Sequence, residues 1–113
     1  MLTLYIGGPM TGYPDLNYPA FHKAENDLEQ AGFTTLNPAH NNPDEKTWLN
    51  FMRMSLVQIS QAHGLALLPD WHRSKGAQIE YQLFCDLGLE VRTVEQWLTG
   101  QLIHNEHPTL FQH

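Results

Sequence analysis

The chain has 113 residues, of which 42% are hydrophobic and 16% are charged; this balance predicts one globular domain and excludes an intrinsically disordered chain. Its formal net charge is −6 with only six lysines and arginines, which excludes a nucleic-acid polymer as a partner but leaves a small anionic ligand open. No apolar run approaches the roughly 20 residues of a membrane span, and the first residues lack a signal-peptide pattern, so we expect no membrane partner and a cytoplasmic location.

The chain opens with a predicted strand, loop and helix. Residues 2–6 are apolar and predict a short buried strand, which the glycine-rich loop 7–12 ends. A helix is expected over residues 18–31, with Asp15 or Asn17 as its N-cap. The apolar stripe of this helix has residues three and four apart, namely Phe21, Ala24, Leu28 and Ala31.

A second strand and a second helix follow. Residues 33–36 predict the strand, and a polar loop over residues 38–46 leads to a helix over residues 46–61. The residues expected on the buried face of this helix are Leu49, Met52, Leu56 and Ile59.

The remaining elements continue the alternation. Residues 65–68 form a strand that is apolar throughout, as expected when both of its faces are covered. A helix over residues 75–87, a short strand over 89–91 and a last helix over 94–103 follow, and residues 104–113 form a polar tail. The residues expected to face the core from the helix over 75–87 are Ile79, Leu83 and Leu87.

This order predicts an α/β domain over residues 1–103 with a small parallel sheet, because strands and helices alternate along the whole segment. The expected strand order is 2-1-3-4. No repeat or linker divides the chain, so the tail over residues 104–113 is the only segment placed outside the domain.

The cysteine and histidine content predicts neither a disulfide nor a metal site. Cys85 is the only cysteine, and we expect it to be a buried structural thiol within its helix. The seven histidines contain no H-E-x-x-H motif, and the spacing of His104 and His107 in the tail is only a weak pattern. We therefore expect no metal and no cofactor.

The segment from Ser74 to Glu80 carries the strongest signal for chemistry, because it follows a strand at the edge where open α/β sheets bind ligands. Ser74 suits the N-cap of its helix, and a helix start can hold an anion. Gly76 and Ala77 lie four and three residues before Glu80, and their small side chains leave the surface over Glu80 open. Glu80 is then a nucleophile or a base, or else a solvated helix glutamate.

The loop after the first strand is a second candidate for ligand binding. Its residues of interest are Gly7, Gly8, Pro9, Met10 and Gly12. Glycines let the backbone approach a ligand closely, although a tight turn without chemical meaning fits the pattern equally well. The loop matches neither the dinucleotide pattern G-x-G-x-x-G nor the Walker pattern, so it predicts no dinucleotide or ATP site.

Four segments together resemble a known family: residues 5–12 (Tyr-Ile-Gly-Gly-Pro-Met-Thr-Gly), 37–39 (Asn-Pro-Ala), 67–71 (Leu-Leu-Pro-Asp-Trp) and 74–80 (Ser-x-Gly-Ala-x-x-Glu). Over about residues 2–92 the chain resembles a phage and bacterial family of uncharacterised proteins, DUF4406. That family is similar in turn to nucleoside 2-deoxyribosyltransferases and to 2′-deoxynucleoside 5′-monophosphate N-glycosidases.

The resemblance implies a Rossmann-like, flavodoxin-type three-layer fold and chemistry at the anomeric carbon of a nucleotide or nucleoside. In the similar transferases a helix glutamate attacks C1′ and displaces the base; Glu80 matches that glutamate, and Tyr5 matches a tyrosine that orients it. The position of Ser74 tends to carry Asp in the transferases and Ser in the monophosphate hydrolases, where it binds the 5′-phosphate. The resemblance therefore favours a nucleoside 5′-monophosphate as substrate and water as the acceptor of the sugar.

The chain departs from the family at carboxylates that assist the departing base. Ser55 and His63 stand where the family commonly carries Asp, so the general acid is left open. His63 would supply the acid or be structural, and Asp70 is a second candidate for the acid or for a ribose contact. Trp71 would stack on the base or pack as a loop lid.

We therefore expect an N-glycosidase or deoxyribosyltransferase-like enzyme that acts on a small nucleotide or nucleoside. The loss of both carboxylates keeps alternatives open: a nucleotide-binding or sequestering module without turnover, or an interaction protein with a vestigial site. Relatives assemble as dimers or larger, so the resemblance also implies a homo-oligomer.

Overall fold

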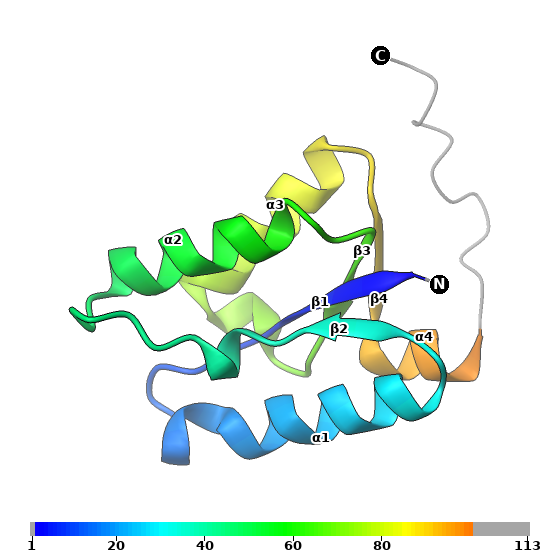
Figure 1. Ribbon diagram of the computed structural model, residues 1–113, viewed down its shortest axis with the longest axis horizontal. Coiled ribbons are helices and arrows are strands. Elements are labelled where there is room, and N and C mark those ends of the chain that lie inside the picture. The colour runs from blue at the N-terminus through cyan, green and yellow to red at the C-terminus, as the bar shows by residue number, and fades with distance from the viewer. Residues whose placement is uncertain (1, 101–113) are drawn as a thin grey trace.

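A computed structural model describes residues 2–100, and the predicted tail over residues 104–113 lies outside them. Four parallel strands form one sheet in the order β2-β1-β3-β4, which confirms the predicted order (Figure 1). The strands are β1 (Thr3–Gly7), β2 (Thr34–Leu36), β3 (Gly64–Leu67) and β4 (Glu90–Thr93).

Helices cover both faces of this sheet. The α-helices are α1 (Tyr18–Gln30), α2 (Trp48–Ile59), α3 (Lys75–Asp86) and α4 (Val94–Thr99). Short 3₁₀ helices lie in three connections, namely η1 (Pro14–Asn17), η2 (Pro38–His40) and η3 (Trp71–Arg73). Figure 1 shows α1 and α4 on one face and α2 and α3 on the other, an arrangement compatible with a Rossmann-like three-layer fold. Within residues 2–100, no helix has the length and apolar character needed to cross a membrane.

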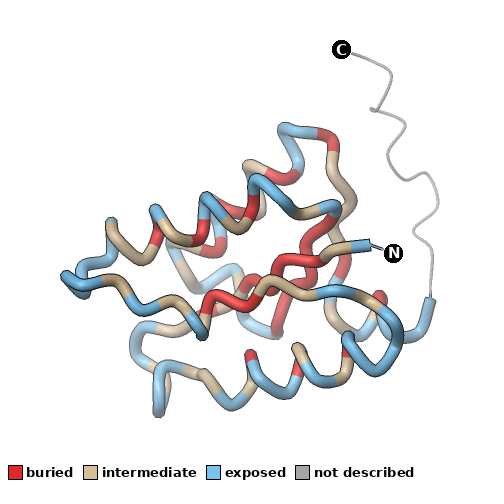
Figure 2. Tube along the Cα trace, in the orientation of Figure 1, coloured by how far each residue is buried: buried red, intermediate tan, exposed pale blue. Residues whose placement is uncertain are grey.

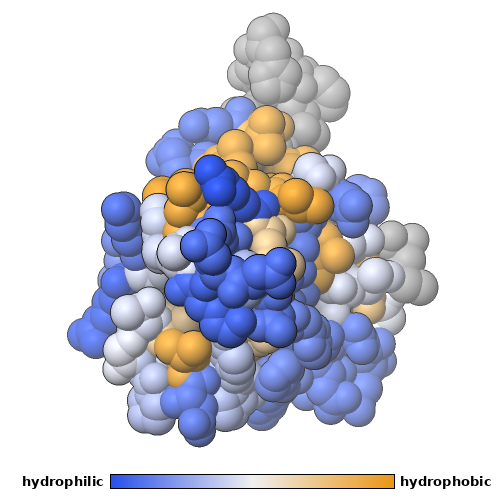
Figure 3. Space-filling view, turned by 60° about the vertical axis from the view of Figure 1, so that its left-hand side comes forward, coloured by the Kyte–Doolittle hydropathy of each residue, from blue (hydrophilic) through white to orange (hydrophobic). Residues whose placement is uncertain are grey.

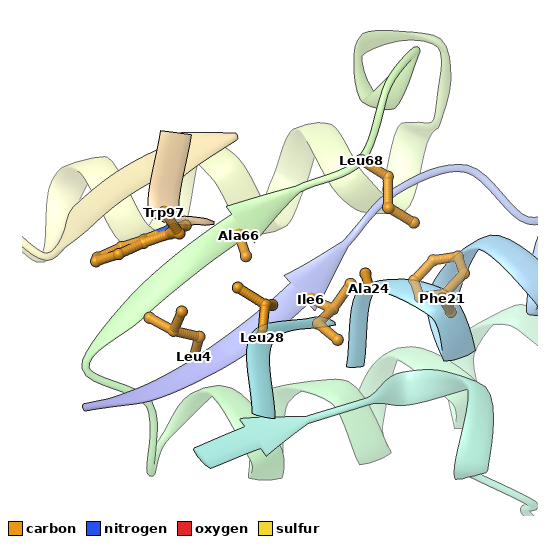
Figure 4. Packing of buried hydrophobic residues seen from close by; sticks show 8 residues of the cluster. All are labelled: Leu4, Ile6, Phe21, Ala24, Leu28, Ala66, Leu68 and Trp97. Carbon is orange, nitrogen blue, oxygen red and sulfur yellow. The ribbon is translucent and has the colours of Figure 1, made fainter. Parts of the chain in front are cut away.

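The face of the sheet under α1 and α4 holds one hydrophobic cluster (Figure 4). Alternate residues along β1 and β3 point into it, because successive side chains of a strand point to opposite faces. Its buried members are Leu4, Ile6, Phe21, Ala24, Leu28, Ala66, Leu68 and Trp97. The predicted stripe of α1 is thus confirmed except at Ala31, which lies past the end of the helix and is exposed.

The opposite face holds a second cluster, which α2 and α3 cover. Its buried members are Tyr5, Ile59, Leu65, Leu67 and Phe84. The central strands are buried almost throughout, as the red segments of the tube show (Figure 2). Strand alternation therefore places Tyr5 on the same face of the sheet as α3, which carries Glu80.

The predicted inner faces of the second and third helices are wrong at several positions. The misplaced residues, all exposed, are Leu49, Leu56, Ile79 and Leu87. The residues that are buried in their place, beside the correctly predicted Met52 and Ile59, are Ser55, Ala77, Glu80 and Phe84. The buried stripe of each helix therefore passes through a polar residue, Ser55 in α2 and Glu80 in α3, which a hydrophobic pattern assigns to solvent.

Two local expectations are also corrected. Cys85 is exposed on α3 and is not a buried thiol, because the buried stripe of this helix lies at Ala77, Glu80 and Phe84. Asn17 occupies the N-cap position of α1 with a left-handed backbone, but its side chain does not cap the helix. It donates instead to the carbonyl oxygen of Pro9 at 2.9 Å and so ties the start of α1 to the loop after β1.

Candidate active site

A cavity of about 250 Å³ lies at the carboxyl ends of the central strands. Its walls come from the loop after β1, the segment that leads into α1, the segment after β2, the first two turns of α2 and the first two turns of α3. The chain leaves β1 for β2 on one side and returns to β3 on the other, so this is the switch point at which open α/β sheets bind ligands.

Glu80 and Tyr5 meet at the inner end of the cavity. Glu80 is only 5% exposed, and the Tyr5 hydroxyl donates to Glu80 Oε2 at 2.7 Å. Burial raises the pKa of Glu80 to about 7, although hydrogen bonds with Tyr5 and Ser55 act to lower it. Burial, followed by the charge of Glu80, raises the pKa of Tyr5 well above its ordinary value, so the phenol keeps its proton and remains a donor.

Ser55 brings a second hydroxyl to this pair. It is buried on α2, lines the cavity and acts through hydrogen bonds to lower the pKa of both Tyr5 and Glu80. A serine hydroxyl favours the ionised form of Glu80 by donating to it, but it does not release a proton as a carboxylic acid does. Ser55 therefore supports a carboxylate at Glu80 and cannot take the acid role that the resemblance implies for an Asp at its position.

The start of α3 forms the wall beside Glu80. Ser74 is the N-cap, as predicted, and its hydroxyl accepts from the backbone N–H of Ala77 at 3.1 Å. Ser74, Gly76 and Ala77 all line the cavity. A Cβ added at Gly76 would lie 3.2 Å from Met52 Sδ, so this glycine keeps the wall clear. Because the first N–H groups of a helix lack intrahelical partners, this wall suits an anion.

The loop after β1 contributes part of the lining. Of the loop residues predicted to bind substrate, Gly8 and Met10 line the cavity, whereas Gly7, Pro9 and Gly12 do not. Gly7 lies behind the nucleophile candidate, since a Cβ there would stand 3.6 Å from Glu80 Oε1 and 3.1 Å from Leu65 Cδ1. Gly12 has a φ of +88°, a turn conformation that explains the glycine without a ligand.

Several lining residues come from the polar loop and helix start that the sequence did not single out. Trp48, at the first turn of α2, and Lys46 both line the cavity. Lys75 Nζ lies 4.6 Å from the centre of the Trp48 ring, so this indole has a cationic neighbour, although Lys75 itself does not line the cavity. The sequence signal for Trp48 was only its place close after the polar, proline-containing loop over residues 38–46. That signal does not indicate where the loop lies in the fold.

Three predicted site residues are not brought to the cavity. His63 lies just before β3, at the opposite end of the sheet, where its Nδ1 accepts from the backbone N–H of Thr3 at 2.9 Å. Asp70 is exposed in the turn before η3 with a left-handed backbone. Trp71 stacks on Tyr81 with ring centres 4.5 Å apart. None of the three lines the cavity, so the structure supports neither an acid at His63 or Asp70 nor base stacking on Trp71.

The charged groups of the lining are few. Among the described residues around the cavity, Glu80 is the only carboxylate, Lys46 is the only cationic side chain, and no histidine is present. The cavity therefore combines one buried carboxylate of raised pKa, two hydroxyl groups that hydrogen-bond to it and a helix start.

Comparison with known proteins identifies one family. Residues 2–93 match the sequence model of a family described as a domain of unknown function, DUF4406. No curated protein matches the chain. The matched segment extends from β1 to β4 and includes every residue of the cavity.

Proposed function

The chain belongs to the DUF4406 family, and on that premise we propose that it hydrolyses the N-glycosidic bond of a nucleoside 5′-monophosphate. The observation that carries the proposal is the buried Glu80 carboxylate, which accepts from the Tyr5 hydroxyl at 2.7 Å and lies in a cavity beside the start of its own helix, α3. This pairs a nucleophile with an anion-binding helix end in one site of about 250 Å³.

The proposed reaction has two steps. The ionised Glu80 attacks C1′ of the sugar, the bond from C1′ to the base nitrogen breaks, and its electron pair leaves with the base. Water then attacks C1′ of the glycosyl-enzyme, which releases the sugar phosphate and regenerates the carboxylate, while the base gains a proton. Ser74, the first N–H groups of α3 and Lys46 would hold the phosphate, and Trp48 would face the base.

A second candidate function is nucleotide binding or sequestration without turnover. The observation that favours it is the lining itself, which in the described residues contains no carboxylic acid other than Glu80 and no imidazole to protonate the leaving base. General acid catalysis is typically worth about 10²–10⁴-fold, so its absence would slow or abolish base release.

Incubation with the four 2′-deoxynucleoside 5′-monophosphates and their ribose counterparts distinguishes these functions. Chromatography should show free base and sugar phosphate in equal amounts if the chain is an N-glycosidase. Binding measured by calorimetry without any base release would support sequestration. No heat and no base release with any of the nucleotides would exclude both functions.

Substitutions at Ser74 test the phosphate contact. Asp and Asn both cap helices well, so Ser74→Asp and Ser74→Asn should fold equally, but only Asp places a negative charge at the proposed phosphate position. We expect Ser74→Asp to bind nucleoside monophosphates at least about tenfold more weakly than Ser74→Asn, because like charges repel.

Free nucleosides provide the control for this pair. Without a phosphate, a nucleoside should bind both variants with similar affinity, as measured by calorimetry. Equal loss of monophosphate binding in Ser74→Asp and Ser74→Asn would show that Ser74 acts only through its hydroxyl or its cap and that no phosphate lies near it.

We also propose that the chain forms a homo-oligomer through the outer face of α2. Leu49, Leu56 and Val57 of this helix are 50%, 43% and 64% exposed. Positions 49, 56 and 57 lie seven and eight residues apart and therefore share one helix face. Hydrophobic side chains also gather on the surface in Figure 3, beside strongly hydrophilic ones, and such patches are typical of interaction surfaces.

The substitution Leu56→Glu should shift the assembly toward monomer. Sedimentation equilibrium should give the wild-type chain at least twice the 13.0 kDa mass and Leu56→Glu a dissociation constant at least about tenfold higher. Leu2→Glu is the matched control, because Leu2 is also 43% exposed but lies just before β1 and not on α2. A wild-type chain that sediments as a monomer would contradict this proposal.

A further inference from the structure

A cluster of metal-ligating groups lies on the edge of the molecule outside the cavity lining. His22 and Glu25 stand one turn apart on α1, and His40 comes from η2, the 3₁₀ helix that follows β2. One nitrogen of each histidine and one oxygen of the carboxylate all lie within 4.8 Å of one another. His40 Nε2 is 3.0 Å from Glu25 Oε1, and His22 Nδ1 is 3.7 Å from the same oxygen.

We propose that these three side chains bind a divalent transition-metal ion, with Zn²⁺ as the best match. Two imidazoles and one carboxylate form a donor set that suits Zn²⁺ and its neighbours and does not suit Mg²⁺ or Ca²⁺, which prefer oxygen ligands only. Tetrahedral Zn²⁺ with bonds of about 2.0–2.1 Å separates its ligand atoms by about 3.3 Å. The separations of 3.0 Å and 3.7 Å from Glu25 Oε1 lie on either side of this value, and all three ligand atoms lie within 4.8 Å of one another, so side-chain rotations would bring them to the ligand spacing of Zn²⁺.

Asn37 contacts two of the three ligand groups, because its Nδ2 also lies 3.4 Å from His22 Nδ1. It is only 3% exposed, and its Nδ2 donates to Glu25 Oε1 at 3.2 Å and to the carbonyl oxygen of Phe21 at 3.4 Å. Its Oδ1 accepts from the backbone N–H of Ala39 at 2.9 Å, which fixes the turn that carries His40. Hydrogen bonds to ligand side chains are typical of metal sites, because they fix the ligand geometry before the ion arrives.

The site is open to solvent on its other side. The side chains of His22 and His40 are 47% and 58% exposed, so an ion can enter and retain a water molecule as its fourth ligand. The net charge of −6 favours cation binding at the surface. Tyr18, which lines the cavity, has its ring centre 6.3 Å from that of His22, so the ion would lie one helical turn from the cavity wall.

The sequence did not predict this cluster because its ligands come from different elements. Glu25 and His40 are fifteen residues apart, and only the parallel pairing of β2 with β1 places η2 beside α1. The inference does not depend on the proposed glycosidase activity, since no group of this cluster lines the cavity.

Calorimetric titration of the untagged, metal-free full-length chain with ZnCl₂ tests the proposal. We expect one equivalent of Zn²⁺ to bind, and His40→Ala and Glu25→Gln to weaken this binding at least about tenfold. Titration with Co²⁺ should give visible absorption bands of a four-coordinate ion in the wild-type chain and lose them in both variants. Circular dichroism confirms that each variant is folded.

Two controls separate this cluster from other histidines. His72→Ala removes an exposed histidine outside the cluster, and a triple Asn variant of His104, His107 and His113 removes those beyond the described residues. Both should bind Zn²⁺ as the wild-type chain does. The proposal is overturned if the wild-type chain binds no Zn²⁺, if His40→Ala and Glu25→Gln bind it unchanged, or if the triple variant alone loses it.

Discussion

Glu80→Gln is expected to lower the rate of base release from a nucleoside 5′-monophosphate at least about 10³-fold. Glutamine keeps the shape of the side chain and an oxygen that accepts from Tyr5, but an amide does not attack C1′. Because the change leaves Ser74 and the start of α3, the proposed phosphate site, intact, nucleotide affinity should stay within about threefold of wild type. Single-turnover chromatography of the released base measures the rate, and calorimetry measures the affinity.

The pH dependence of the wild-type rate is an independent readout of the same group. Glu80 attacks only as a carboxylate, so kcat/KM should rise as the pH passes through about 7. This is the pKa to which burial raises the Glu80 carboxyl group in the free enzyme. Tyr5→Phe removes the donor at 2.7 Å, one of the hydrogen bonds that lower the pKa of Glu80, and should move this rise to higher pH. A Glu80→Gln rate within about tenfold of wild type would show that another group attacks the sugar.

The strand order and the positions of the helices followed from the sequence because they depend on local patterns. Glycine-rich breaks, apolar strands and hydroxyl N-caps mark element ends wherever they occur. Ser74, Gly76 and Glu80 were placed together for the same reason, since their spacing on one helix fixes their relative positions. Tyr5 and Glu80 are 75 residues apart in the sequence. Their contact was therefore predicted from the family resemblance and not from spacing.

The errors concentrate where the site departs from ordinary helix packing. Ser55 and Glu80 turn inward, and the apolar residues Leu56 and Ile79 turn outward. A hydrophobic pattern assumes that the apolar stripe faces the core, so two helices that bury polar groups at a cavity mislead it. The exposed stripe of α2 would be explained if a second chain covers it.

The sequence left open which residue would protonate the departing base. The structure places neither of the two candidates, His63 and Asp70, at the cavity. His63 was a candidate because the resemblance implies a carboxylate at its position, but it lies before β3 at the opposite end of the sheet. Trp48 reaches the cavity from a loop whose path no local signal specifies, whereas Trp71 packs on Tyr81. Loops and contacts distant in sequence are thus where the sequence alone was insufficient.

Glu80→Gln should also stabilise the folded chain, and the gain should grow with pH. The pKa of Glu80 rises from its ordinary value of 4.5 to about 7 on folding because the carboxylate is buried. Between these two values the folded chain keeps a proton that the unfolded chain has released, so the free energy of unfolding of the wild type falls as the pH rises. At roughly 1.4 kcal/mol for each unit of pKa, the loss approaches about 3 kcal/mol above pH 7.

Urea unfolding at pH 4.5, 6 and 8 measures this effect. Glutamine stays neutral at every pH, so the stability of Glu80→Gln relative to wild type should increase by about 2–3 kcal/mol from pH 4.5 to pH 8, with all other groups titrating alike. Glu45→Gln, at an exposed position of the loop before α2, is the control and should follow the wild-type profile. A difference between Glu80→Gln and wild type that stays constant with pH would mean that Glu80 is ionised in the folded chain as readily as in the unfolded one. The cavity would then be more hydrated than its burial indicates, and the same carboxylate would be a weaker nucleophile.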